Sequence, residues 1–177
     1  MENVFIAIFC IALLLFGALT ISEASLNSTD EIASAWRQME ETSGEISRTN
    51  ISSVGAVVTS ANSFEVTLKN EGETKLQNFE DWDVIVQYFD NAQGNLLVKW
   101  LPYTEAGNPG NNEWTVGGIY LDAATSDPEV FEKGIFNPGE EMVIDVKLVS
   151  VIDQEVANLV TISTPNGVSA SEFFIRP

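Results

Sequence analysis

The stretch VFIAIFCIALLLFGALTI, residues 4–21, carries no charged side chain and decides the architecture of this chain. About 20 consecutive apolar residues are enough to cross the hydrocarbon core of a bilayer as a helix. No proline occurs between Met1 and Thr42, and Gly17 alone interrupts the run. The stretch is therefore predicted to be helical, and its apolar surface has to be covered by lipid or by protein.

Three interpretations of this opening segment are open. A secretion signal fits the small residues of Ser22-Glu23-Ala24, but a signal normally starts with Lys or Arg, and here the only early charge is Glu2. A permanent membrane anchor fits the length, although no Lys/Arg cluster or Trp/Tyr belt marks its ends. The third interpretation is a helix buried against copies of itself.

The helical pattern continues beyond the apolar stretch. After the polar residues 22–30, Ile32, Trp36 and Met39 recur at the i, i+4, i+7 spacing of an amphipathic helix. The sequence thus predicts one helix from about residue 3 to about residue 48, roughly 70 Å long at 1.5 Å per residue. Its first half is apolar all round, so it needs partners beyond its own small domain.

From about residue 52 the sequence changes to short β-prone runs separated by Gly, Pro and Asn. Two connections, 61–63 and 90–94, have the composition of tight hairpin turns. The fold class is therefore α+β: a long N-terminal hydrophobic α-helix, residues 1–50, followed by an all-β immunoglobulin-like sandwich, residues 51–177. The predicted strands are 54–60, 64–70, 82–89, 95–101, 114–121, 142–149, 158–164 and 171–176.

The strand MVIDVKLV, residues 142–149, shows the period-2 alternation of a half-buried strand most clearly. Large aromatic residues in a small sandwich usually fill the core. Trp82, Trp100 and Trp114 are therefore candidates for the core, of which Trp82 is expected there and Trp114 is left open between core and surface. The stretch 128–134 is interpreted as an exposed loop or a short helical turn.

Composition excludes several functions. Lys and Arg number 8 against 26 Asp and Glu, for a net charge of -18, which disfavours nucleic acid and anionic membrane surfaces as partners of the soluble part. The chain has no histidine, and its single cysteine, Cys10, lies in the apolar run as a small hydrophobic residue. No nucleophile motif or phosphate-binding loop occurs. We predict no enzyme activity, no catalytic residue, no cofactor and no small-molecule substrate.

Two further kinds of site were considered. Acidic residues gather in two places, yet neither has the ligand spacing of a calcium loop, so no metal site is predicted. These residues are Glu80, Asp81, Asp83, Glu140 and Glu141. Two Asn-x-Ser/Thr triplets, beginning at Asn27 and Asn50, are candidate N-glycosylation sites.

Three segments, in this order behind an apolar helix, carry a resemblance to a known family. They are LKNEGETKLQNFEDWDVIVQY (68–88), FNPGEEMVIDVKL (136–148) and VTISTPNGVSASEFF (160–174). The chain resembles the archaellins, the filament subunits of the archaeal motility organelle, and the wider class of archaeal type IV pilin-like proteins. Bacterial type IV pilins carry Glu at the fifth mature position, where this chain has Phe5, so the archaellin-like alternative is favoured.

The resemblance implies a life cycle. A prepilin peptidase would remove a short basic leader, and the missing basic residues before the helix fit a chain already processed. The helix would span the inner (cytoplasmic) membrane before assembly. It would then form the core of a helical homopolymer, an extracellular filament at the cell surface that serves motility and surface adhesion, with the sandwich as its outer layer.

The resemblance also assigns residues to filament-core packing, and small residues such as Ala7 and Ala12 would let helices approach closely. The packing residues are Val4, Phe5, Ile8, Phe9, Ile11, Leu14, Leu15, Phe16, Gly17 and Ile21. The amphipathic stripe is Ile32, Trp36 and Met39. Relatives in the same class include membrane-anchored stator components that bind the surface layer, and adhesive pilins. The sequence leaves these alternatives open.

Overall fold

The computed structural model describes residues 2–177, apart from the side chains of residues 2–3 and 23–27. The chain divides into two compact units, Met1–Gly44 and Glu45–Pro177. The first unit consists of helix, and the second contains all of the described strands.

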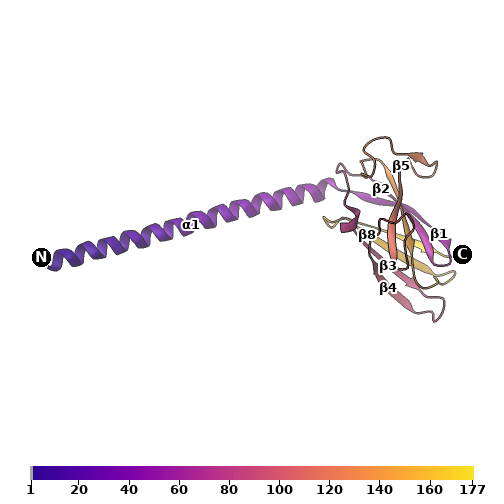
Figure 1. Ribbon diagram of the computed structural model, residues 1–177, viewed down its shortest axis with the longest axis horizontal. Coiled ribbons are helices and arrows are strands. Elements are labelled where there is room, and N and C mark those ends of the chain that lie inside the picture. Colours follow the sequence, from indigo (N-terminus) through magenta and orange to yellow (C-terminus); the bar gives the residue numbers. More distant parts are fainter. Residues whose placement is uncertain (1) are drawn as a thin grey trace. The chain divides into compact units, whose positions relative to one another are not determined.

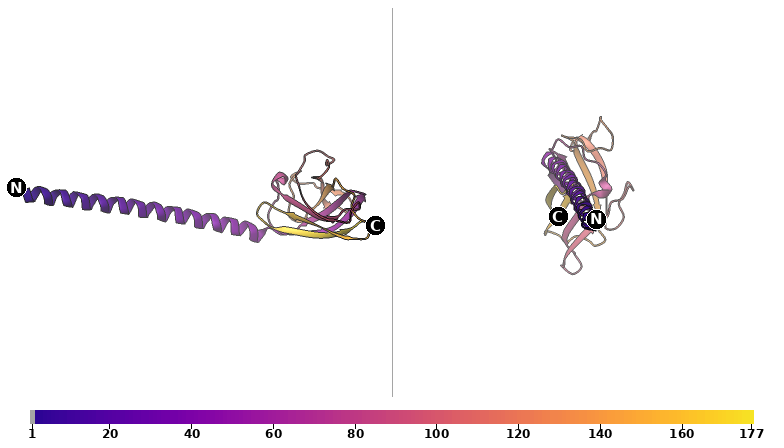
Figure 2. Two further views of the ribbon diagram at one scale, coloured as in Figure 1. Left: turned by 90° about the horizontal axis from the view of Figure 1, so that it is seen from below. Right: turned by 90° about the vertical axis from the view of Figure 1, so that its left-hand side faces the viewer.

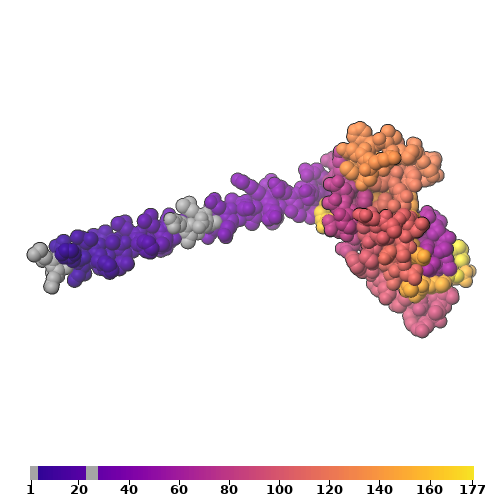
Figure 3. Space-filling view, in the orientation of Figure 1, coloured from indigo at the N-terminus to yellow at the C-terminus, as the bar shows by residue number. Residues whose placement is uncertain are grey.

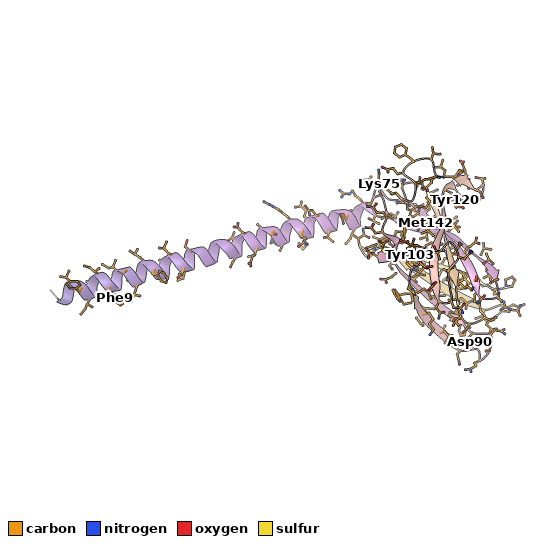
Figure 4. The ribbon with its side chains drawn as sticks, in the orientation of Figure 1. Phe9, Lys75, Asp90, Tyr103, Tyr120 and Met142 are labelled. Atoms are coloured by element: carbon orange, nitrogen blue, oxygen red, sulfur yellow. The ribbon has the colours of Figure 1, made fainter. Side chains whose placement is uncertain are left out.

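Helix α1 runs without interruption from Glu2 to Arg48, as the sequence predicted (Figure 1). Gly17 does not break it, and the Thr20 hydroxyl donates a hydrogen bond to the Gly17 carbonyl at 2.9 Å. Side chains such as Phe9 project outward from the helix (Figure 4). A helix gains most of its stability from packing of its apolar surface. Lipid or another chain must therefore supply that packing.

Among the described residues, strands form two antiparallel sheets that lie face to face (Figure 2). The five-stranded sheet has the order β1-β2-β7-β5-β6, and the four-stranded sheet has the order β4-β3-β8-β9. The predicted immunoglobulin-like sandwich is confirmed. The strands are β1 (Ile51–Ser60), β2 (Ser63–Asn70), β3 (Asp83–Phe89), β4 (Leu96–Leu101), β5 (Glu113–Asp122), β6 (Asp127–Pro128), β7 (Glu141–Lys147), β8 (Ala157–Ser163) and β9 (Ser169–Ile175), with a short 3₁₀ helix, η1 (Phe79–Asp81).

The core lies between the sheets and follows from strand alternation. Along β7, Met142, Ile144 and Val146 are buried, as the period-2 pattern predicted (Figure 4 labels Met142). Phe64 of β2 stacks on Phe174 of β9 with ring centroids 4.1 Å apart. This stack joins the two sheets, because β2 belongs to one and β9 to the other.

The tryptophans divide between core and surface. Trp82 is 2% exposed, which confirms its predicted core position, and Trp114 is fully buried. Trp100, the third candidate for the core, does not lie there, because its side chain is 58% exposed. Trp100 pairs with Ile85 of β3, and this register places both on the outer side of the sheet.

The turns follow their sequence signals, while some strand limits differ from the prediction. In the 90–94 hairpin loop, Gly94 has φ 65° and its N–H donates to the Asp90 carbonyl at 2.9 Å (Figure 4 labels Asp90).

Strand β1 begins at Ile51, earlier than predicted, because Ile51 already pairs with Asn70. The segment 128–134 is a loop that begins with the end of strand β6, which pairs with β5.

The last helical turn is fixed to the sandwich by hydrogen bonds. The Glu73 N–H donates to the Arg48 carbonyl at 2.8 Å. The Asn166 side-chain amide donates to the Thr49 hydroxyl, also at 2.8 Å. Gly72 allows this approach, because a Cβ there would lie 2.5 Å from the Arg48 carbonyl oxygen. Residues 45–50 therefore enter the sandwich in a defined conformation.

Candidate interaction surfaces

The first candidate surface is the apolar half of α1. In the described part of the chain, one helix is long and apolar enough to cross a membrane, over Val4–Ser22 with mean hydropathy 2.9. The large apolar residues predicted to pack in a filament core are all exposed, from 56% at Ile11 to 74% at Phe5 and Leu14. They lie all round the helix, so this surface suits lipid as well as a bundle. Their packing role stays a prediction.

The second candidate surface is the stripe of Ile32, Trp36 and Met39. These side chains are 58%, 64% and 59% exposed. No described contact covers them within the chain, and they lie in the part of α1 that follows the membrane-length stretch. An apolar stripe of this kind is normally covered by another apolar surface.

The third candidate surface is the outer face of the four-stranded sheet. The register aligns Val98 of β4, Gln87 of β3, Leu159 of β8 and Phe173 of β9 in one row across the sheet. Neighbouring rows add further outward-facing apolar residues. These are Ile85, Phe89, Leu96, Trp100, Ala157 and Ile175.

This outer face differs in charge from the rest of the chain. Among its outward-facing strand positions, the described residues include one ionisable side chain, Asp83. The Asp83 carboxylate accepts a hydrogen bond from the Trp100 indole N–H at 2.7 Å. A contiguous apolar patch on a chain of net charge -18 is typical of a protein contact.

Sequence reasoning missed the outer face, although a signal was present. In NLLVKWL, residues 95–101, both alternating sets of positions are largely apolar. A strand that is apolar on both sides is expected to be covered on both sides. Leu101 is buried in the core, whereas Leu96 and Val98 are 54% and 59% exposed. Recognising the surface therefore requires the strand register.

The loop that follows β6, which lies in the orange region of Figure 3, carries two exposed apolar side chains. Val130 and Phe131 are 79% and 71% exposed. The loop is held by an ion pair of 2.5 Å between Lys75 and Glu132, near the Lys75 label in Figure 4. The Asn137 side-chain amide donates to the Phe131 carbonyl at 3.1 Å. This loop is thus tied to the sandwich by side chains.

Three of the acidic residues considered as metal ligands, Asp83, Glu140 and Glu141, have hydrogen-bond partners in the sandwich. Glu140 is 4% exposed, and its carboxylate accepts a hydrogen bond from the Asn137 N–H at 2.8 Å. Glu141 accepts one from the Ala123 N–H at 3.0 Å and lies 3.9 Å from the Lys69 ammonium. Within the described residues, no three His, Cys, Asp or Glu side chains are grouped to hold a metal ion.

The carboxyl group of Asp145 lies in an electrostatically unfavourable position. Asp145 of β7 lies directly opposite Glu65 of β2. Burial, and then the negative charge of Glu65, raise the pKa of the Asp145 carboxyl. Gly117 makes room for this side chain, because a Cβ there would lie 2.6 Å from the Asp145 carboxylate oxygen. The folded sandwich therefore disfavours the ionised form of Asp145.

We predict that Asp145→Asn raises the melting temperature of the sandwich at pH 7. Because the folded-state pKa of Asp145 lies above its unfolded value of about 3.8, the wild type gains stability as the pH falls through that window. The variant lacks this gain, so the difference in stability between the two proteins narrows as the pH falls from neutral through the raised pKa of Asp145. Thermal melts at several pH values measure it, and a constant difference would contradict the assignment.

The remaining predicted sites lie on or near α1. Asn50 is exposed just after the helix, so its side chain is accessible for glycosylation, whereas the side chain of Asn27 lies outside the described residues. Cys10 is exposed in the single chain, like its neighbours. Burial of Cys10 would therefore come from lipid or another chain.

Comparison with known proteins relates the sandwich to the archaellum. Residues 47–132 match the family described as conserved flagellar protein F, immunoglobulin-like domain. The archaellum periplasmic stator protein FlaG from Sulfolobus acidocaldarius is 24% identical, with a TM-score of 0.50, covering 71% of this chain and 99% of that one. Archaeal flagellin FlaB1 from Methanocaldococcus jannaschii is 14% identical, with a TM-score of 0.51, covering 73% and 90%.

A third structure, the FlaF and FlaG stator complex from Sulfolobus acidocaldarius, is 23% identical with a TM-score of 0.49, and the match covers 70% of this chain and 87% of that one. No curated protein matches the chain. Residues 47–132 thus resemble a flagellar-protein domain, and the sandwich shares its fold with the stator protein FlaG and the flagellin FlaB1. The filament-subunit interpretation stays a prediction.

Proposed function

We propose that this chain is a membrane-anchored structural component of the archaellum, with a stator-like role. Residues 4–22 of α1 would remain in the cytoplasmic membrane, and the sandwich would lie outside it. The observation that carries the proposal is the order of two features: one membrane-length helix, followed by a domain whose residues 47–132 match flagellar protein F.

The charge of the second half of α1 supports an anchor over a filament core. Between Thr29 and Ile46 the helix carries a group of ionisable side chains, most of them acidic, spread over about half of its circumference. They are Asp30, Glu31, Arg37, Glu40, Glu41 and Glu45. Burying unpaired carboxylates among neighbouring helices costs several kcal/mol each. This half is therefore suited to water on one side.

The filament subunit remains the second candidate, and one observation favours it. The large apolar residues of 4–21 cover the whole circumference of the helix, so neighbouring helices could surround it as well as lipid does. The sandwich also has the fold of archaeal flagellin FlaB1, as the TM-score of 0.51 indicates. In this candidate function the chain would be a homopolymer outside the cell.

Fractionation of cells separates the two functions. We expect an antibody against the sandwich to detect the chain in the membrane pellet, resistant to carbonate and extracted by detergent. We also expect its absence from filaments sheared off the cell surface. If sheared filaments contain the chain as their main subunit, the anchor function is wrong and the homopolymer is right.

The outer face of the four-stranded sheet is the surface through which we expect the sandwich to contact another archaellum protein. Val98→Asp places a charge in the central row of this face and should reduce swimming in soft agar. Because Val98 is already 59% exposed, the substitution should change the free energy of unfolding by only about 0.5 kcal/mol.

Val54→Asp is the matched control for this prediction. Val54 is 56% exposed and lies at a β-bulge of β1, the edge strand of the other sheet. It introduces the same change at a similar exposure, so swimming should stay normal. Equal motility of the two variants, at equal amounts of protein in the membrane, would remove the outer face from the proposal.

A further inference from the structure

Beyond the membrane-length stretch, α1 contains a continuous uncharged line of residues. Positions spaced alternately three and four residues apart carry no ionisable side chain from residue 29 to residue 46. These positions, which we call the seam, are Thr29, Ile32, Trp36, Met39, Ser43 and Ile46. The spacing averages 3.5 residues, which is the repeat of left-handed coiled coils.

The charged residues of the same segment avoid the seam. In a heptad whose a and d positions are the seam, all but one of them fall on positions b, c and f, which face away from a partner helix. The residues at b, c and f are Asp30, Glu31, Arg37, Glu41 and Glu45. The exception is Glu40, at an e position beside Met39.

The large side chains of the seam are exposed to solvent in the single chain. Ile32, Trp36 and Met39 are each more than half exposed. About 25 residues of helix separate the end of the membrane-length stretch from the sandwich, which amounts to roughly 40 Å. A helix of this length in water depends on packing for its stability. The seam therefore needs a partner with a matching apolar line.

We propose that residues 29–46 pair with the same segment of a second copy, as a parallel, in-register, two-stranded coiled coil. The inference rests on the proposed function, because copies anchored in one bilayer share their orientation and are held at a high local concentration. The seam is self-complementary: in register, each seam residue of one copy meets the same residue of the other.

The flanks of the seam favour a second copy over a charged partner. In a parallel pair, a g position of one helix lies beside the following e position of the other. Glu40 at e therefore faces Ala35 at g of the second copy, and Ser47 faces Thr42. No carboxylate meets its counterpart across the seam, so two strongly acidic chains can approach along this line.

Disulfide cross-linking of the full-length chain in membranes tests the pairing. Cys10→Ala removes the native thiol, and Met39→Cys or Ile32→Cys then places a single thiol on the seam. Glu41→Cys, at an f position on the far side, is the matched control. After oxidation with copper phenanthroline, we expect several-fold more disulfide-linked dimer from Met39→Cys and Ile32→Cys than from Glu41→Cys.

A second variant tests whether the seam is needed for the dimer, and a mass measurement gives the number of chains in each particle. Adding Met39→Glu to the Ile32→Cys chain should abolish the dimer while circular dichroism still reports a helical chain. Light scattering of the detergent-solubilised protein should give two chains of 19.3 kDa per particle. Three outcomes would overturn the proposal. They are equal cross-linking at residues 39 and 41, the absence of a dimer at residues 32 and 39, and a particle of three or more chains.

The same samples separate failure of this pairing from failure of the proposed function. If the chain is in the membrane pellet without a dimer at residue 39, the anchor function stands and the coiled coil is wrong. If cross-linked chains are found in sheared filaments, with products from both faces of the helix, the anchor function and the two-stranded pairing are both wrong.

Discussion

Replacing Trp114 with alanine is expected to destabilise the sandwich by about 3–5 kcal/mol, which is the usual cost of removing a large aromatic side chain from a core. Trp114 is fully buried, and its ring packs edge-on against Tyr103 with centroids 4.9 Å apart. A domain of this size has about 5–15 kcal/mol of total stability, so the variant loses a large part of it. Urea unfolding of the full chain in detergent, followed by near-ultraviolet circular dichroism, measures the change.

Two further tryptophan variants serve as controls for this prediction. Trp114→Phe should cost much less than Trp114→Ala, because the buried Trp114 indole N–H has no hydrogen-bond partner to lose. Trp100→Ala should cost about 1 kcal/mol or less, since Trp100 is 58% exposed and its hydrogen bond to Asp83 lies at the surface. If the two alanine variants are equally destabilised, the assignment of Trp114 to the core and Trp100 to the surface is wrong.

Replacing Leu14 with aspartate is expected to release the chain from the membrane while the sandwich stays folded. Leu14 lies near the middle of the span Val4–Ser22. Exchanging Leu for Asp at the centre of a membrane helix costs about 3–4 kcal/mol of insertion free energy. The fraction of chain in carbonate-washed membranes should therefore fall strongly, as measured by immunoblot. If the helix instead forms a filament core, the same variant should abolish filaments.

The control for this prediction lies on the same helix. Ser34→Asp adds the same charge in the second half of α1, at an exposed position away from the seam. Its membrane association should match that of the wild type. Normal membrane association of Leu14→Asp, or normal filaments built from it, would show that residues 4–22 are not the apolar segment on which the protein depends.

The sequence predicted the helix and the fold class well, because both depend on local patterns. An uncharged run followed by the Ile32, Trp36 and Met39 stripe indicates one long helix whichever environment it meets. The alternation in 142–149 likewise identifies a strand with one buried side. Turn residues such as Gly94, with φ 65°, then divide the strands at the expected places.

The position of each tryptophan could not be predicted in the same way. Trp100 and Trp114 both lie in strands rich in apolar residues, and either side of such a strand could face the core. The pairing of Trp100 with Ile85 sends it outward, whereas Trp114 lies on the inner side of β5. A shift of one residue in register would reverse these positions, and register depends on contacts between distant segments.

Some features of the candidate surfaces could likewise be predicted from the sequence, whereas others depend on the tertiary structure. By itself the sequence determined the membrane-length helix, the uncharged seam and the acidic character, because these properties belong to residues close together in the chain. Only the tertiary structure decided that Val98, Leu159 and Phe173 share one outer face, since β4 lies far along the chain from β8 and β9. It also decided that Glu140 stabilises a turn, because burial and the Asn137 hydrogen bond depend on how the chain folds back on itself.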